Sequence, residues 1–183
     1  MGLGAHMQRW NVEICEGLVA RGYRVIRFDN RDVGMSTKLD MSAVPDFNAI
    51  FPGRPAGVPY TLHDMTDDTL GLMDSLDISR AHIVGASMGG MIAQLLALKN
   101  PLRVHTLTLI MSSSGNPFLP PPKPEALRVL LRPIPLQRDK YIEHFLETWG
   151  ILNGAEIPID RARLRRLAEC SSMRCCSSGG VMA

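Results

Sequence analysis

The chain has 183 residues, of which 45% are hydrophobic and 21% are charged, and its formal net charge is +2 at pH 7. This composition is that of an ordinary globular protein, and it excludes a disordered or fibrous chain. The near-neutral charge argues against a nucleic-acid partner, which selects for clustered basic residues. No apolar run reaches the ~18 residues of a membrane span and no signal peptide is recognisable, so we expect a cytoplasmic protein with no membrane partner.

The cysteines and the glycine-rich stretches give no sign of a metal or cofactor. Of the four cysteines, three lie between residue 170 and the C-terminus, and their spacing matches no zinc site. We interpret them as free thiols of a reducing compartment. No Lys-Ser/Thr pair follows the glycines of residues 85–90, and G-x-G-x-x-G is absent, so we expect no phosphate-binding loop.

The first sixty residues predict one helix, one strand and two irregular segments. Residues 11–20 carry apolar side chains at helical spacing and precede Gly22, which predicts a short helix. Residues 24–29, RVIRFD, predict a strand with β-branched residues at its centre. The next segment, 30–36, is a predicted loop, and the proline-rich stretch 39–59 is predicted to be irregular.

The middle of the chain alternates helical and extended patterns. Apolar residues recur every three or four positions over 62–76, which predicts an amphipathic helix that Thr61 and Asp64 cap together. Two apolar strands are predicted, and a buried helix over 88–99 separates them. The strands cover residues 81–84 and 104–111. Strands that alternate with helices predict a parallel sheet with helices on its faces.

The pattern changes after Gly115. Residues 116–124 form a proline-rich linker, and at least one helical turn is predicted at 127–131. A longer amphipathic helix is predicted to start near Asp139, and a short basic helix to cover 160–168. The last residues are small and polar without periodicity, which predicts a loose tail.

The sequence GASMGG, residues 85–90, places Ser87 between Gly85 and Gly89 in the form G-x-S-x-G. A predicted strand enters this motif and a predicted helix leaves it, which is the setting of a nucleophilic serine on a tight turn. Glycines here permit close approach of strand and helix, and the helix N-terminus favours developing negative charge. The alternative is a serine that caps the helix and performs no chemistry.

Three motifs in this order resemble those of the α/β-hydrolase superfamily, in its proline iminopeptidase-like and aclacinomycin methylesterase-like branch. MGLGAHMQRW resembles the oxyanion loop, RFDNRDVGMS resembles the D-x-R-G-x-G-x-S loop, and HIVGASMGGMIAQLLALKNP resembles the nucleophile elbow. The resemblance implies an α/β fold: residues 1–115 would form a partial hydrolase core, a parallel sheet with helices on both faces. Residues 116–183 resemble the start of a helical lid, followed by the loose tail.

The resemblance also implies roles for individual residues. Ser87 matches the nucleophile, and the backbone N–H groups of Leu3 and Met88 match the oxyanion hole. Met1 stands where many members have histidine, and Asp32 stands where many have glycine, a change that aspartate tolerates because it adopts left-handed backbone more readily than most residues. Two charged residues of the second motif are interpreted as fixing its loop rather than as catalytic: Asp29 and Arg31.

The acid and the base of the family's triad are not found at the expected places. They follow the serine in chain order, yet His105 opens a strand at the wrong end of the sheet and His144 lies on a lid-like helix. The other histidines, His6, His63 and His82, precede the serine. The family's strand before the oxyanion loop is also missing, so we interpret the chain as a fragment and expect it to be poorly stable alone.

Two functions remain open. The first is a serine hydrolase that cleaves a small-molecule carboxylic ester or amide through an acyl-enzyme at Ser87. The second is a catalytically incompetent fragment or a non-catalytic remnant that lacks the acid and histidine of the triad.

Overall fold

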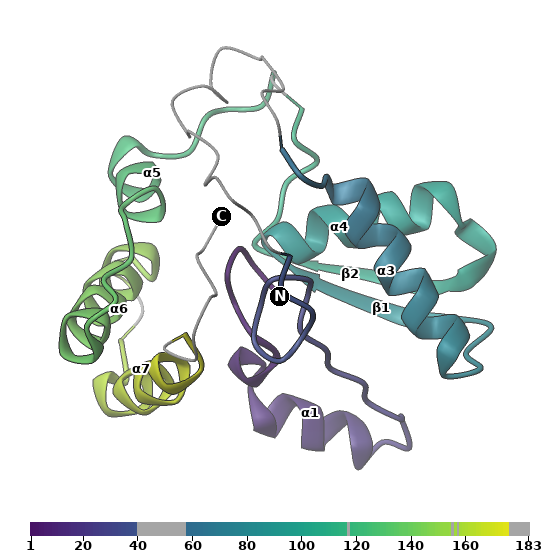
Figure 1. Cartoon of the computed structure of the whole chain (residues 1–183), viewed down its shortest axis with the longest axis horizontal. Helices are drawn as coiled ribbons and strands as arrows, with labels where there is room; N and C mark the ends of the chain where they lie inside the picture. Colours follow the sequence, from purple (N-terminus) through teal and green to yellow (C-terminus); the bar gives the residue numbers. More distant parts are fainter. Residues whose placement is uncertain (40–57, 117, 155, 157, 176–183) are drawn as a thin grey trace. The chain divides into compact units, whose positions relative to one another are not determined.

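The computed structural model of the chain describes residues 1–39, 58–116, 118–154, 156 and 158–175, which Figure 1 draws in colour. The chain divides into two compact units: the first contains Met1–Asn116 and the second begins at residue 117. The predicted irregular stretch 39–59 lies mostly outside the described residues.

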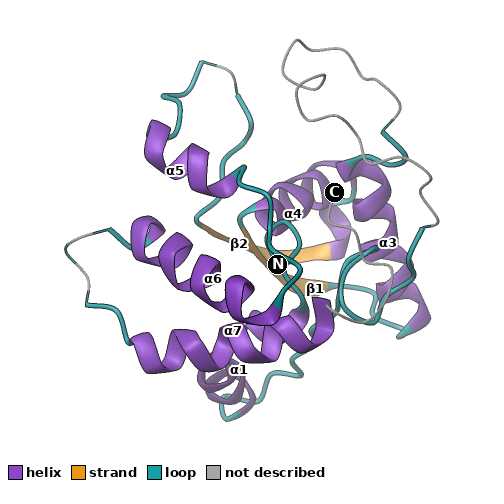
Figure 2. Cartoon of the chain, turned by 60° about the vertical axis from the view of Figure 1, so that its left-hand side comes forward, coloured by secondary structure: helices purple, strands orange, loops and turns teal. Residues whose placement is uncertain are grey.

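The first unit contains a parallel pair of strands. The strands are β1 (Ala81–Ala86) and β2 (Val104–Ile110), paired from Ala81 and Val104 at one end to Ala86 and Ile110 at the other. Helix α4 (Met88–Lys99) connects them and packs against both, and α3 (Leu62–Ser75) packs against α4 (Figure 2). Shorter elements complete the unit: η1 (Met7–Arg9), α1 (Val12–Val19) and η2 (Pro101–Arg103). The predicted α/β class and parallel pairing are confirmed.

The two helices beside the sheet begin for identifiable reasons. Thr61 and Asp64 form the predicted capping box: the Thr61 side chain accepts from the helix backbone, and the Asp64 carboxylate accepts the Thr61 N–H at 2.7 Å. Three apolar residues of α4, Ile92, Ala93 and Leu96, are buried. The prediction of a wholly buried α4 holds only in part, because Leu98 near its end is 79% exposed.

The predicted strand at residues 24–29 is wrong: this segment forms neither helix nor strand in the structure. β-branched residues favour extended backbone, but a strand also needs a neighbouring strand with which to share hydrogen bonds. β1 pairs only with β2 among the described residues, although the ring of Tyr23 meets that of His82 on β1 edge-on, with centroids 5.6 Å apart. The segment therefore approaches the sheet without joining it.

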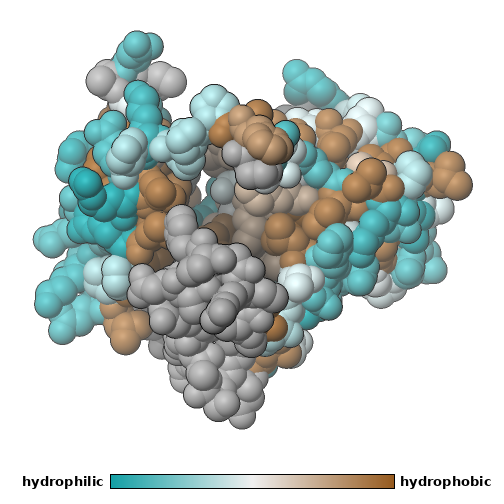
Figure 3. Space-filling model, turned by 90° about the horizontal axis from the view of Figure 1, so that it is seen from above, coloured by the Kyte–Doolittle hydropathy of each residue, from teal (hydrophilic) through white to brown (hydrophobic). Residues whose placement is uncertain are grey.

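The two-stranded sheet leaves apolar side chains exposed. Val84 on β1 and Leu107, Leu109 and Ile110 on β2 are 37–43% exposed. Such side chains are ordinarily covered on both faces of a parallel sheet. Figure 3 shows hydrophobic residues in brown on the face of the molecule that it draws. The described strands thus bury less apolar surface than a complete parallel sheet would.

The second unit consists of three helices, α5 (Pro124–Leu130), α6 (Arg138–Leu152) and α7 (Arg161–Cys175). Helix α6 packs against both α5 and α7. The core of this unit contains Tyr141, Ile142 and Phe145 of α6 and Ala168 of α7. The ring centroids of Tyr141 and Phe145 lie 6.1 Å apart. The predicted amphipathic helix near Asp139 is therefore the centre of this unit.

The predicted end of the basic helix at residue 168 is wrong, because α7 continues to Cys175. Ser171 and Ser172 are each 1% exposed, and the Ser172 hydroxyl donates a hydrogen bond to the Glu169 carbonyl at 2.8 Å. Small serines can be buried where helices approach closely, and they satisfy their hydroxyls within the helix. The predicted loose tail is thus incorrect for 170–175, and 176–183 lie outside the described residues.

Candidate active site

Ser87 lies on the tight turn between β1 and α4 with a strained backbone. Its φ is 54° and its ψ is −123°, a region that a residue with a side chain seldom occupies. Such a conformation costs about 1–3 kcal/mol and persists only where the surrounding structure enforces it. Ser87 is half-buried, so its hydroxyl sits at the carboxyl end of the sheet rather than in the core.

Backbone hydrogen bonds on both sides hold Ser87 in this conformation. Its N–H donates to the Ile110 carbonyl at the end of β2, at 2.9 Å. Its carbonyl accepts from the N–H groups of Gly90 and Met91 in the first turn of α4, at 2.8 and 3.3 Å. The positive end of the α4 dipole therefore lies beside Ser87, where it favours negative charge.

The glycines around Ser87 are required by close contact. A Cβ on Gly85 would collide with the Gly89 carbonyl oxygen and lie 2.7 Å from both the Gly89 carbonyl carbon and the Gly90 Cα. A Cβ on Gly89 would lie 2.6 Å from the Met1 carbonyl oxygen. The contacts of Gly85 bear out the prediction that the strand and the helix approach too closely for a side chain. The close approach of Met1 to Gly89 is a further contact that the sequence did not predict.

The loop that resembles an oxyanion loop does reach Ser87. A Cβ on Gly2 would lie 3.2 Å from the Ser87 Cβ and 3.4 Å from its Oγ. The next residue is Leu3, whose side chain is 57% exposed, so any contribution of Leu3 to the site comes from its backbone. The loop is turned by a hydrogen bond from the Ala5 N–H to the Gly2 carbonyl, at 3.1 Å.

Asp29 ties this first loop to the second motif. Its carboxylate accepts from the Met7 N–H at 2.5 Å and from the Met35 N–H at 3.0 Å. Its carbonyl accepts from the Ser36 hydroxyl at 2.5 Å, and the residue is 8% exposed. A buried carboxylate with two backbone donors is a strong constraint on both loops. These contacts agree with the interpretation of Asp29 as a loop-fixing residue.

Asp29→Ala should lower the free energy of unfolding by about 2–4 kcal/mol, because the N–H groups of Met7 and Met35 lose a buried, charged acceptor. The measurement is urea unfolding followed by circular dichroism. Asp67→Ala is the control: Asp67 is exposed and its distance to the Lys99 ammonium is 3.8 Å, so its loss should cost under ~0.5 kcal/mol. Equal losses in the two variants would contradict the role assigned to Asp29.

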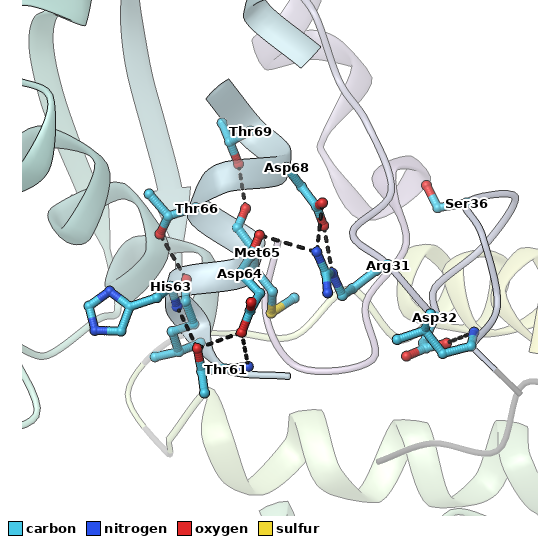
Figure 4. Close-up of polar contacts among 12 residues, drawn as sticks. Arg31, Asp32, Ser36, Thr61, His63, Asp64, Met65, Thr66, Asp68 and Thr69 are labelled. Atoms are coloured by element: carbon cyan, nitrogen blue, oxygen red, sulfur yellow. Dashed lines mark hydrogen bonds and ion pairs between the residues drawn. The ribbon is translucent and has the colours of Figure 1, made fainter. Parts of the chain in front are cut away.

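Arg31 joins the second motif to α3, as Figure 4 shows. Its guanidinium donates to both Asp68 carboxylate oxygens, at 2.6 and 2.7 Å, and to the Asp64 carbonyl at 3.2 Å. The hydrogen bond to Asp68 raises the pKa of Arg31. The guanidinium also lies 5.1 Å from the centre of the Tyr60 ring. The paired geometry accounts for an arginine at this position and supports the loop-fixing interpretation.

Asp32 has the left-handed backbone that its position requires, with φ 63°. Its carboxylate accepts from the Leu39 N–H at 2.7 Å, so the side chain closes the loop that its backbone turns. Burial raises the pKa of Tyr60 to about 12, and a side-chain hydrogen bond with Asp32 adds to this shift. The expectation that aspartate can replace glycine here is therefore supported by its conformation.

The histidines do not supply a base to Ser87 in the described part of the chain. His82 and His105 lie at the starts of β1 and β2, with ring centroids 5.1 Å apart, at the end of the sheet opposite Ser87. His63 is in the first turn of α3, and His144 is on α6 in the second unit, where burial lowers its pKa. Within these residues, no histidine ring hydrogen-bonds the Ser87 hydroxyl.

Ser112 also contacts the backbone of Ser87. The Ser112 hydroxyl donates to the Ser87 carbonyl at 2.8 Å, a contact that the sequence does not reveal because Ser112 is the first of three consecutive serines.

Across the described ranges, no group of three or more histidine, cysteine or acidic side chains could hold a metal ion. Nor is any helix of this part long and apolar enough to cross a membrane.

Known proteins are similar to this chain in sequence. Rhodomycin D methylesterase of Streptomyces peucetius is 31% identical over 176 residues, which cover 86% of this chain and 54% of that protein. A 2-hydroxy-6-oxononadienedioate/2-hydroxy-6-oxononatrienedioate hydrolase of Paraburkholderia xenovorans is 48% identical over 118 residues, covering 63% of this chain and 35% of that protein. The chain spans about half the length of the methylesterase, and less of the second relative.

A solved structure shows the same fold. The meta-cleavage product hydrolase of Pseudomonas fluorescens superimposes with a TM-score of 0.65 and 23% identity, over 97% of this chain and 54% of that one. The profile of the alpha/beta hydrolase fold family matches residues 2–155, which include Ser87, both loops and most of the second unit. The chain therefore belongs to the α/β-hydrolase fold family.

Proposed function

We propose that Ser87 is the nucleophile of a serine hydrolase that cleaves a carboxylic ester through an acyl-enzyme. The observation that carries this proposal is the strained, half-buried serine between β1 and the N-terminus of α4. Its Oγ would attack the ester carbonyl carbon, and its proton would pass to a base and then to the leaving alcohol. Water would next attack the acyl-enzyme and release the acid.

The backbone N–H groups of Met88 and Leu3 are the proposed oxyanion donors. Met88 follows Ser87 at the start of α4, and Leu3 follows Gly2, whose backbone lies against the Ser87 side chain. Donors aimed at the position of the developing negative charge stabilise the tetrahedral intermediate more than the substrate. Hydrolase relatives support this assignment of the reaction class.

We infer that a base for Ser87 lies outside the described residues, since no histidine ring among them hydrogen-bonds the Ser87 hydroxyl. A serine hydroxyl without a base stays protonated at neutral pH and attacks slowly. We therefore expect the 183-residue chain by itself to be catalytically incompetent, with only a weak residual rate from the oxyanion donors. We propose that activity belongs to a longer natural protein in which an acid and a base accompany this chain, which spans about half the length of the methylesterase.

The substrate that we propose is a small or medium apolar ester. Two aromatic residues of the lid-like segment, Tyr141 and Phe145, are buried in the core of the second unit. Phe118 and Leu119 are 93% and 47% exposed. The proposed substrate class is thus supported mainly by the 31% identity to a methylesterase. The lid-like segment supports it less, because two of its aromatic residues are buried in the core.

A fluorophosphonate probe tests the nucleophile directly, since it labels serines that a base activates. In the natural protein, mass spectrometry should locate the adduct on the peptide that contains Ser87. The isolated 183-residue chain should react at least ~100-fold more slowly, because it lacks the base. A natural protein that is not labelled at Ser87 would support the non-catalytic alternative.

Turnover should be faster on p-nitrophenyl butyrate than on a prolyl p-nitroanilide. We expect at least a tenfold preference in kcat/KM, because esters have better leaving groups and the lid-like segment exposes the apolar residues Phe118 and Leu119. Both chromogenic substrates are assayed by absorbance at equal enzyme concentration. A preference for the prolyl amide would leave Ser87 in its role but overturn the proposed substrate class.

A further inference from the structure

The segment that follows β2 is shaped to hold the backbone of Ser87. β2 ends at Ile110, whose carbonyl accepts the Ser87 N–H at 2.9 Å. Met111 then has a φ of 42°, the left-handed region that a residue with a side chain seldom adopts. This turn allows the next residue, Ser112, to donate from its hydroxyl to the Ser87 carbonyl at 2.8 Å. Two residues of one segment thus grip the Ser87 backbone, one from each side.

The place of the Ser112 side chain is also built. A Cβ on Gly90 would collide with the Ser112 Oγ and lie 2.5 Å from its Cβ, so the missing side chain at Gly90 leaves the room that Ser112 occupies. The Gln94 side chain on α4 donates to the Ser113 carbonyl at 3.0 Å and to the Gly90 carbonyl at 3.2 Å. These contacts fasten the segment after β2 to the first turns of α4.

The hydrogen bond from Ser112 acts on the peptide group that carries the Met88 N–H. The Ser87 carbonyl and the Met88 N–H belong to one planar trans peptide, and they point in opposite directions. Fixing the direction of the carbonyl therefore fixes the direction of the N–H. A donor at the carbonyl oxygen also polarises the peptide, which makes the N–H a stronger donor.

We infer that Ser112 is a positioning residue that orients and polarises the Met88 N–H for the oxyanion through its hydrogen bond to the Ser87 carbonyl. This inference rests on the proposed function for its catalytic consequence, but the contact itself does not. Ser112 touches neither substrate nor reacting atoms in this scheme. Its effect passes through one peptide group, and this effect should stabilise the tetrahedral intermediate more than it strengthens substrate binding.

The neighbouring serines provide a matched control. Ser113 and Ser114 carry the same hydroxyl on the same segment, but their hydroxyls accept hydrogen bonds from the N–H groups of Gly115 and Asn116, at 3.2 and 3.4 Å. Neither contacts Ser87 in the described structure. Ser113→Ala therefore removes a hydroxyl one residue away without removing the contact with the nucleophile's carbonyl.

The test combines spectroscopy with kinetics. In the 183-residue chain labelled with ¹³C and ¹⁵N, Ser112→Ala should move the Ser87 carbonyl ¹³C and the Met88 amide ¹⁵N resonances upfield, and Ser113→Ala should leave both in place. Ser112→Cys, a weaker donor, should give intermediate shifts and serves if the alanine variant does not fold. In the natural protein, Ser112→Ala should lower kcat about tenfold with KM changed less than twofold, against the 10²–10³ expected for losing a direct donor.

Unmoved resonances in Ser112→Ala, or equal shifts in Ser113→Ala, would overturn the inference. So would a loss of kcat/KM that lies entirely in KM. If neither Ser112 variant of the 183-residue chain gives resolved spectra, the separate changes in kcat and KM of Ser112→Ala in the natural protein decide the question. Failure of the proposed function appears differently, as absence of phosphonate labelling at Ser87 with the Ser112-dependent resonance shifts intact.

Discussion

Gly85→Ala should abolish cooperative unfolding of the first unit. The new Cβ would collide with the Gly89 carbonyl oxygen and lie 2.7 Å from the Gly89 carbonyl carbon and the Gly90 Cα, all of which are backbone atoms. No rotamer change relieves such a contact, so α4 would have to move away from β1. Overpacking of this kind costs about 4 kcal/mol or more when the backbone cannot yield, against a total of about 5–15 kcal/mol for an intact domain.

Gly71→Ala is the matched control for that variant. Gly71 lies within α3, and a Cβ there would meet no described atom within 4 Å. Alanine in a helix interior is favoured over glycine by roughly 0.5–1 kcal/mol, so this variant should be slightly more stable. Thermal unfolding followed by circular dichroism compares the two. A sharp transition in Gly85→Ala near that of the unsubstituted chain would show that strand and helix are packed less tightly than described.

The elements predicted correctly are those whose cause is local. The capping box joins Thr61 and Asp64, three positions apart, and is predicted from the sequence. The parallel pairing of β1 and β2 is also predicted, because a helix connects the two strands along the chain. The turn at Ser87 is local too, because the G-x-S-x-G spacing within GASMGG is typical of a tight strand-to-helix connection. Short-range patterns of this kind carry their own structural reason.

The errors come from partners that are distant in the sequence. Residues 24–29 have the composition of a strand, but strand formation depends on a neighbour, and none pairs with them in the described chain. Helix α7 extends past residue 168, and Ser171 and Ser172 in the extension are buried, which a count of polar residues does not predict. In both cases packing, rather than composition, decided the outcome.

The site shows the same division. Ser87 and the two loops are found from motifs, whereas the contact of Ser112 with the Ser87 carbonyl joins positions 25 residues apart. Nothing in three consecutive serines distinguishes the first from the others. The links between Asp29 and Met7 and between Arg31 and Asp68 are also non-local, and their consequence is that both loops are fixed around the turn that carries Ser87.

Ser87→Ala and Ser87→Gly should separate catalysis from backbone strain. Both variants remove the nucleophilic hydroxyl, so in the natural protein both should lower kcat for p-nitrophenyl butyrate on the order of 10⁴- to 10⁶-fold. Only glycine adopts φ 54° and ψ −123° without a steric penalty. Ser87→Gly should therefore be more stable than Ser87→Ala by about 1 kcal/mol in urea unfolding.

The comparison is informative because each half can fail alone. Turnover within tenfold of the unsubstituted protein in either variant would remove Ser87 from the mechanism. Equal stabilities of the two variants would mean that the turn is not strained, although the nucleophile assignment would stand. The expected pattern, two inactive variants of which the glycine form is the more stable, would show that the fold holds an energetically unfavourable turn at the residue whose hydroxyl the reaction needs, a cost that persists because activity depends on that placement.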